Sequence, residues 1–313
     1  SEELYERFED RSLEKSYAYR PFDIRKIYYD PELLARARFD FMRHIVNYNN
    51  LVLITIRRPR SDMVANFFVS NIITDKCYIS SLDNCQILPL YTLPRSSAHA
   101  YSKSDLINID PDFLKKLANT LSLKQTRKNE IPDGIIPEDI FYYVYAVFHS
   151  PSYRKRYSEF LKIDFPRLPI PCSIGLFHGL ISIGTELVNL HLMKSLSLRD
   201  ITTTYMGPQR PLVERVGWVN ETVWLDTPIA RKGQPTRPGT IGFRDVPEAV
   251  WNFYIGGYQV CERWLKDRKG RTLSRADINH FQRIVVDIAE TIRLMKEIDE
   301  VIEQHGGWPG AFA

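Results

Sequence analysis

The side chains in this sequence that could do chemistry are mainly cations gathered in short clusters. Each cluster falls in a predicted loop, at a strand end or at a helix start, where long side chains can reach a ligand freely. Guanidinium and ammonium groups bind phosphate oxygens, and a guanidinium also pairs with guanine edges. The four clusters are Arg57, Arg58 and Arg60; Lys124, Arg127 and Lys128; Arg154, Lys155 and Arg156; and Lys266, Arg268, Lys269 and Arg271.

The distribution of charge along the chain favours a polyanionic partner. The 313 residues carry a net charge of +4, yet residues 1–14 and residues 287–313 each sum to −4, which leaves +12 between them. A basic middle between acidic ends suggests nucleic acid. The alternative, in which these cations are only solvated surface residues, stays open at this point.

Motifs for catalysis or metal binding are missing from the sequence. There is no G-x-G-x-x-G, no G-x-x-x-x-G-K-[ST], no G-x-S-x-G and no H-E-x-x-H. The triplet Asp267-Arg268-Lys269 fits an acid-x-Lys nuclease pattern, but it falls in a charged turn, so we interpret it as incidental. The seven histidines are interpreted as core or surface residues. We therefore expect no metal and no enzymatic activity in this chain by itself.

The cysteines and the apolar segments indicate the compartment. The four cysteines form no C-x-x-C pair and no disulfide framework, which favours the reducing cytoplasm. The N-terminal residues are acidic rather than secretory. The most apolar stretch, 172–193, is interrupted by His178, Glu186 and His191, so we predict a buried helix instead of a membrane span.

The N-terminal half predicts a mixture of strands and helices. Residues 19–31 are expected to be extended, because a proline biases the residue before it toward the β region. Pro31 is expected to open a helix over 32–46, and Asp110 to cap another. Short β-type runs occupy residues 50–58, 66–73, 76–80 and 86–94.

Two aromatic helices are predicted in the middle of the chain. The first begins at Pro137, and the second follows Ser150. Three prolines then force 164–171 into an extended path, before the buried helix at 173–193. The apolar faces of the two aromatic helices are Ile140, Val144, Val147 and Phe148, and Tyr153, Tyr157, Phe160 and Leu161.

Strands return in the C-terminal half, before a long final helix. β-type runs at 213–219 and 221–226 are expected to form a hairpin, with another run at 240–246. A helix is predicted from Ser274 onward. Its apolar residues alternate in steps of three and four, a spacing typical of lengthwise helix pairing. We expect the partner helix in this same chain; the alternative is a docking surface for a neighbouring domain. The stripe is Ile278, Phe281, Val285, Ile288, Ile292 and Met295.

These patterns predict an α+β fold, in which mixed short β-sheets accompany a central helix group and a long C-terminal helix, as in target-recognition domains. The expected divisions are an acidic lead-in at 1–18, a first α+β recognition part at 19–171, a buried helix with a second β-rich part at 172–273, the long helix at 274–305 and a tail at 306–313.

Long segments of the chain resemble a known family. They are "YRPFDIRKIYYD", "YYVYAVFHSPSYRKRYSEFLKIDFPRLPIP", "WNFYIGGYQVCERWLKDRKGRTLS" and "DINHFQRIVVDIAETIRLMKEID". Together they are similar to the C-terminal specificity domain of type ISP restriction–modification enzymes, over about residues 17–304. Those enzymes are bacterial single-chain proteins that join nuclease, helicase, adenine-N6 methyltransferase and target-recognition parts.

The resemblance implies that the chain reads a sequence in double-stranded DNA and presents the target adenine to a methyltransferase domain outside it. The signature of that methyltransferase, Asn or Asp before Pro-Pro-Tyr or Pro-Pro-Phe, is absent here. S-adenosylmethionine is therefore expected in the neighbouring domain, and the DNA contacts are expected from the four basic clusters except Arg268. The rival hypothesis is a non-catalytic scaffold that docks neighbouring domains and uses its cations for solubility.

Overall fold

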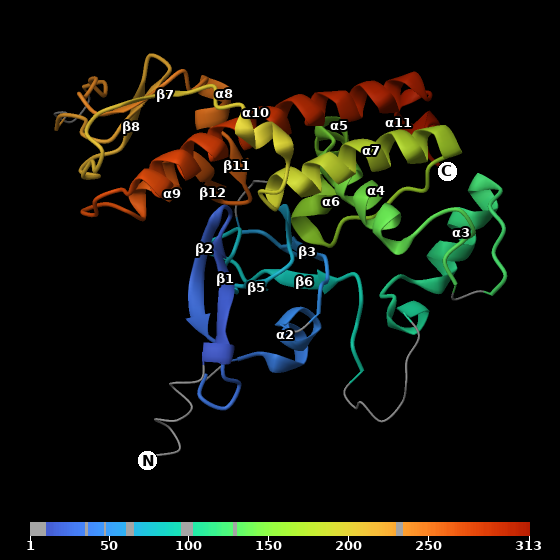
Figure 1. The fold of residues 1–313 in the computed structure, drawn as a ribbon. Coiled ribbons are helices and arrows are strands. Elements are labelled where there is room, and N and C mark those ends of the chain that lie inside the picture. The colour runs from blue at the N-terminus through green and yellow to red at the C-terminus, as the bar shows by residue number, and fades with distance from the viewer. Residues whose placement is uncertain are drawn as a thin grey trace.

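The computed structural model describes residues 11–34, 37–46, 48–60, 66–94, 103–127, 130–229 and 234–313. It confirms the α+β prediction, because helices and several short sheets share the molecule (Figure 1). A long helix, α10 (Arg275–Gln304), runs across it. The N-terminal strands lie below this helix in the view, and a small sheet lies beside its first turns.

The first sheet contains an N-terminal hairpin that attaches to the rest of the molecule through its turn and through a short parallel strand at Ile73–Thr74. The extended path predicted for 19–31 folds back on itself at Pro21–Phe22, and the first strand begins inside the predicted lead-in. Phe22 has a φ of 61°, and burial of its ring offsets the cost of that conformation. The order is β2-β1-β5, and the elements are η1 (Arg11–Leu13), β1 (Glu14–Arg20), β2 (Asp23–Tyr28) and β5 (Ile73–Thr74).

The second sheet separates two cores. Phe67 and Val69 face one core and Phe68 faces the other, as the two-residue period of a strand requires. The strand predicted at 76–80 is wrong: these residues form turns, in which the Cys77 amide donates to Asp75 at 2.7 Å. The antiparallel order is β4-β3-β6, from β3 (Val52–Thr55), β4 (Phe67–Ser70) and β6 (Gln86–Pro89).

Helix α2 is shorter than the helix predicted over 32–46. It spans Phe39–Val46. The residues after Pro31 form a turn, in which the amide of Glu32 donates to the Asp30 carboxylate at 2.8 Å. Such a side-chain bond offers the backbone an alternative to the first helical turn.

The central helices confirm most of the predicted boundaries. The Asp110 carboxylate caps α3 by accepting from the Phe113 amide at 2.9 Å. Helices α4 and α7 touch so closely that a Cβ at Gly184 would lie 2.0 Å from the Tyr142 carbonyl oxygen. The elements are η2 (Lys103–Leu106), α3 (Pro111–Leu121), α4 (Pro137–His149), α5 (Pro151–Arg156), α6 (Ser158–Ile163) and α7 (Ile174–His191).

The second aromatic helix is broken into α5 and α6 at Tyr157. Ser150 caps it as expected, accepting from the Tyr153 amide at 3.0 Å. The prediction that Phe160 is buried is wrong, because the break turns α6 so that only Leu161 points inward and Phe160 is 63% exposed. The proline-rich exit that follows is neither helix nor strand over 165–170, as predicted.

The last β-rich region forms a four-stranded antiparallel sheet. The predicted hairpin is confirmed: Asn220 and Glu221 have positive φ values of 51° and 54°, which a two-residue turn of this kind requires. The order is β7-β10-β9-β8, from β7 (Thr204–Met206), β8 (Gly217–Val219), β9 (Thr222–Trp224) and β10 (Gly242–Arg244). The short elements around it are η3 (Leu196–Arg199), α8 (Glu248–Trp251), β11 (Tyr254–Ile255), β12 (Tyr258–Gln259), α9 (Val260–Lys266) and α11 (Gly307–Gly310).

Helix α10 begins where the sequence predicted. Ser274 and Asp277 bond reciprocally across its first turn. The helix packs lengthwise against α7, which confirms a partner in the same chain. In the second half of α10 the buried residues are Leu294, Ile298 and Ile302, instead of the predicted Ile292 and Met295. The difference arises because the faces of a straight helix drift relative to a seven-residue repeat.

Candidate nucleic-acid interface

The first predicted cluster follows strand β3 and is held by its surroundings. Arg57 donates through Nε to the Asp164 carboxylate at 2.9 Å, and Arg58 donates to the Ile163 carbonyl at 3.1 Å. Arg60 Nε lies 3.4 Å from Oδ1 of Asp83, whose side chain is largely buried. The contacts of Arg57 and Arg58 place these two residues beside the end of α6.

Arg154 lies inside the protein, so the expectation that it projects freely is wrong. It is 9% exposed, and its Nε donates to the Phe148 carbonyl at 2.7 Å. Its guanidinium lies 5.9 Å from the centre of the Phe67 ring. Burial lowers the pKa of Arg154 to about 10. Lys155 and Arg156 are exposed, as predicted.

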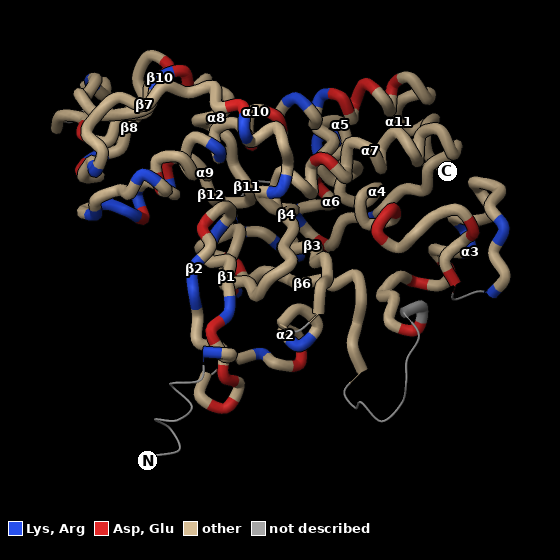
Figure 2. Tube along the Cα trace, viewed as in Figure 1, with Lys and Arg blue, Asp and Glu red and all other residues tan. Residues whose placement is uncertain are grey.

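The second cluster lies far from the fourth. Lys124 and Arg127 are exposed in the loop after α3, and the Arg127 guanidinium is 3.6 Å from a Glu130 carboxylate oxygen. Lys128 lies outside the described residues. Figure 2 shows this loop at the opposite end of the molecule from the turn that follows α9.

The fourth cluster forms the turn between α9 and α10. Lys266 pairs with Glu262 at 2.8 Å, within α9. Lys269 and Arg271 are exposed, and the described residues provide neither of these two side chains with a hydrogen bond or an ion pair. Arg268 differs from them, because it points back toward the N-terminal hairpin.

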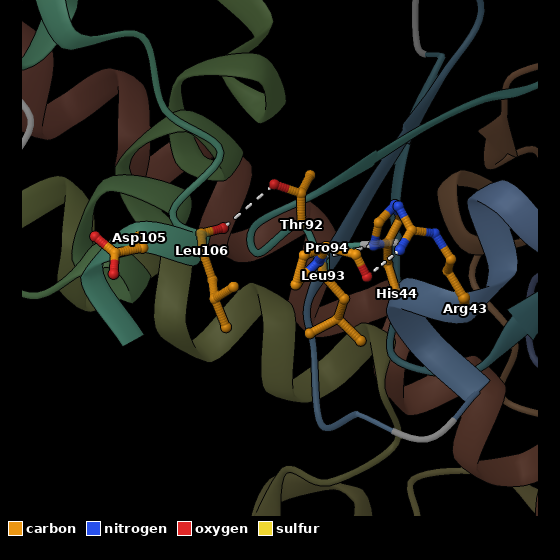
Figure 3. A pocket seen from close by; sticks show the side chains of 7 residues that line it. All are labelled: Arg43, His44, Thr92, Leu93, Pro94, Asp105 and Leu106. Carbon is orange, nitrogen blue, oxygen red and sulfur yellow. Dashed lines mark hydrogen bonds between the residues drawn. The ribbon is translucent and has the colours of Figure 1, made fainter. Parts of the chain in front are cut away.

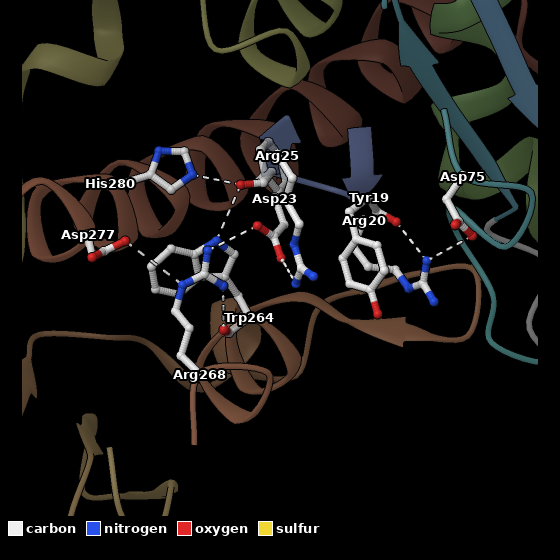
Figure 4. Close-up of polar contacts among 10 residues, drawn as sticks. Tyr19, Arg20, Asp23, Arg25, Asp75, Trp264, Arg268, Asp277 and His280 are labelled. Atoms are coloured by element: carbon white, nitrogen blue, oxygen red, sulfur yellow. Dashed lines mark hydrogen bonds and ion pairs between the residues drawn. The ribbon is translucent and has the colours of Figure 1, made fainter. Parts of the chain in front are cut away.

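Arg268 joins the turn to the hairpin (Figure 4). Its guanidinium stacks 3.5 Å from the centre of the Trp264 ring and donates to the Trp264 carbonyl at 2.9 Å and to Asp23 at 3.0 Å. Arg25 donates to the same Asp23 carboxylate at 2.9 Å. Burial alone would raise the pKa of Asp23, but the two arginines hold it below its usual range. The Asp267-Arg268-Lys269 triplet is thus part of a structural joint.

Two cations on the hairpin were missed by the sequence prediction. Lys26 has a side chain that is 66% exposed, and Arg25 one that is 39% exposed, stacked 3.6 Å from the centre of the Tyr19 ring. The alternation of side chains along Asp23–Tyr28 could have identified Lys26 as outward-facing.

A pocket of about 410 Å³ lies between α2 and the segment after β6 (Figure 3). Its polar groups hold these two segments together: Arg43 donates to the Pro94 carbonyl at 2.5 Å, and the Leu93 amide donates to His44 Nδ1 at 2.8 Å. It therefore presents few free groups to a ligand. The described part of the chain contains no group of three or more His, Cys, Asp or Glu side chains placed to hold a metal.

The sequence matches the family described as the Type ISP C-terminal specificity domain over residues 6–297. This chain belongs to that family. A search of curated proteins finds no match to this specificity domain. Among its described helices, none is long and apolar enough to cross a membrane.

The fold of the specificity domain recurs in solved structures of longer chains. A nuclease-deletion mutant of the Type ISP restriction–modification enzyme LlaGI, in complex with a DNA substrate mimic, has a TM-score of 0.58 and 19% identity, covering 91% of this domain and 20% of that chain. The Type ISP enzyme LlaBIII bound to DNA has a TM-score of 0.59 and 19% identity, covering 95% of this domain and 19% of that chain. The DrdV–DNA complex has a TM-score of 0.64 and 22% identity, covering 92% of this domain and 29% of that chain. The domain thus spans less than a third of each of these chains.

Proposed function

We propose that this specificity domain binds double-stranded DNA and recognises a defined sequence as part of a restriction–modification enzyme. The observation that carries the proposal is its family membership over nearly the whole chain, together with a fold shared with enzymes solved on DNA. Exposed Lys and Arg side chains on ordered elements supply the phosphate contacts that such binding needs. A scaffold that only docks other domains is less well supported, because it does not account for these neighbours.

The finer role that we propose is presentation of a target adenine to a methyltransferase domain outside this chain. That domain would bind S-adenosylmethionine, and the adenine would leave the base stack to reach its active site. The specificity domain itself would then contribute positioning and base contacts, with no catalytic residue of its own. A cytoplasmic location follows from this role, because its substrate would be intracellular DNA.

Binding to labelled duplexes over a range of salt concentrations tests the function. We expect the logarithm of the association constant to fall linearly with the logarithm of salt concentration, by about 0.9 for each phosphate contacted. Selection from a pool of random duplexes should also enrich a defined sequence. Absence of binding at low salt, or binding without any enriched sequence, would overturn the proposal.

A further inference from the structure

Exposed side chains of the hairpin and of the α9–α10 turn lie on one surface, although the two elements are about 240 residues apart in sequence. We call this surface the hairpin–turn face. It comprises Ile24, Lys26, Lys266, Lys269 and Arg271, all of which are exposed. Strand β2 is the edge strand of its sheet, so no further strand covers its outer side among the described residues.

The two parts of the face are fixed to each other by buried contacts. Arg268 bridges Asp23, the first residue of β2, and Trp264 of α9. The Phe22 carbonyl is 3.3 Å from Trp264 Nε1 and 2.7 Å from His280 Nε2 of α10. A surface that is rigid before it binds loses less conformational entropy on binding.

Two of the four cations of the face, Lys269 and Arg271, are free to act on a ligand, whereas Lys26 lies 3.4 Å from Glu14 and Lys266 lies 2.8 Å from Glu262. Asp23 is 2% exposed and is neutralised by two arginines, so it cancels little of the positive field outside. Lys269 and Arg271 lack partners among the described side chains. In the first three clusters, Arg57 and Arg127 are paired with carboxylates and Arg154 is buried.

An apolar side chain stands among these cations. Ile24 is 58% exposed and lies two residues from Lys26, so both project from the same face of the strand. Exposed isoleucine beside lysine suits a groove of DNA, where cations bind phosphates and an apolar group contacts the methyl group of thymine.

We propose that the hairpin–turn face is the surface of this domain that contacts the DNA duplex, and that Ile24 makes an apolar contact with a thymine methyl group. The proposal rests on the proposed function, because it assumes that a duplex is the ligand. It goes further by choosing one surface among the several basic ones and by naming a residue that reads a base.

Two triple variants test the surface. Lys26→Ala, Lys269→Ala and Arg271→Ala together should weaken binding at least about tenfold and reduce the salt slope by up to about 2.7. The matched control is Lys115→Ala, Lys116→Ala and Lys296→Ala, which removes the same charge from exposed positions of α3 and α10. The control should bind as the wild type does, and circular dichroism should confirm that both variants are folded.

The outcomes separate this proposal from the function itself. If the wild type binds duplex and the hairpin–turn variant binds equally well, the hairpin–turn face is not the contact surface, while the proposed function stands. The same conclusion holds if the control variant loses as much affinity as the hairpin–turn variant. A loss confined to a Lys155→Ala, Arg156→Ala variant would assign the contact to α5 instead. If the wild type binds no duplex, the proposed function fails.

Substitution of deoxyuridine for thymine tests Ile24, because it removes only the methyl group. We expect the wild type to lose about fourfold in affinity at one thymine of its selected sequence, the effect of one buried methyl-sized group. The affinity of the Ile24→Ser variant should not change when deoxyuridine replaces that thymine. Leu196→Ser, at a residue that is 70% exposed elsewhere, is the matched control and should keep the sensitivity. If Ile24→Ser keeps it too, the base contact is not made by Ile24.

Discussion

Arg154 is a cation whose burial decides its role. It ties the end of α4 to α5 through the Phe148 carbonyl and lies over Phe67 of strand β4. The neighbouring Lys155 differs by one position and is exposed, because successive helical residues point about 100° apart. Adjacent residues of the same charge therefore have different functions here, one in packing and one at the surface.

Replacing Arg154 with Ala should lower the free energy of unfolding by about 2–3 kcal/mol, because it leaves a buried carbonyl without a donor and removes packing under the aromatic rings. Urea unfolding measures this change. Lys155→Ala is the control and should stay within about 0.5 kcal/mol of the wild type. The duplex affinity of the Arg154 variant, measured where it is fully folded, should equal that of the wild type. A large loss of affinity without loss of stability would contradict the structural role.

At the scale of elements, short polar contacts explain where helices stop and how they meet. Asp299 interrupts the apolar stripe of α10, and its carboxylate accepts from the hydroxyls of Ser150 and Ser152 and from the Ser152 amide at 3.0 Å. It thereby satisfies donors at the first turn of α5, where a helix has unpaired amides. The break in the stripe is thus a joint between α10 and α5.

The hairpin is a second element whose placement depends on its turn. Phe22 inserts into the core formed with α9 and α10, and its ring meets Phe68 of β4 edge-on at 5.5 Å. The exposed part of β2 is thereby held against the α9–α10 turn. This attachment is the reason that cations from the two ends of the sequence share one face.

At the scale of the whole molecule, a buried polar group links the three longest packed helices. His191 of α7 bonds to the Tyr145 hydroxyl of α4 and lies 3.0 Å from Thr291 of α10. Burial, together with the nearby Arg154 charge, lowers the pKa of His191 to about 3. The folded protein therefore keeps this imidazole neutral, whereas the unfolded chain protonates it below about pH 6.5.

This difference predicts a pH dependence of stability. Because the unfolded state binds the proton first, the contribution of His191 is complete above pH 6.5 and declines as the pH falls toward 3. Relative to a His191→Gln variant, the wild type should lose about 2 kcal/mol of unfolding free energy between pH 7 and pH 5. Urea unfolding of both proteins at these pH values measures the difference. Equal pH slopes would refute it.

The comparison between the two proteins is needed because another buried group acts in the opposite direction. Burial raises the pKa of Asp287, so this group favours the folded state at lower pH. Its effect is present in both the wild type and the His191 variant. The difference between them therefore isolates His191.

The sequence by itself determined the features that depend on neighbouring residues. The caps at Asp110 and Ser274, the hairpin turn at Asn220 and Glu221 and the buried α7 were all predicted and confirmed. These features follow from backbone preferences, local hydrogen bonds and hydrophobic periodicity, all of which are written into short stretches of chain.

Only the tertiary structure decided which cations are available and which of them lie together. A sequence pattern does not reveal that Arg154 lies against the ring of Phe67, which is far from it in sequence, or that Arg268 forms an ion pair with Asp23. Nor does it predict that Lys26 and Lys269 share a surface. Side-chain exposure and long-range proximity result from how elements pack, and packing sums many weak contacts between residues far apart in sequence.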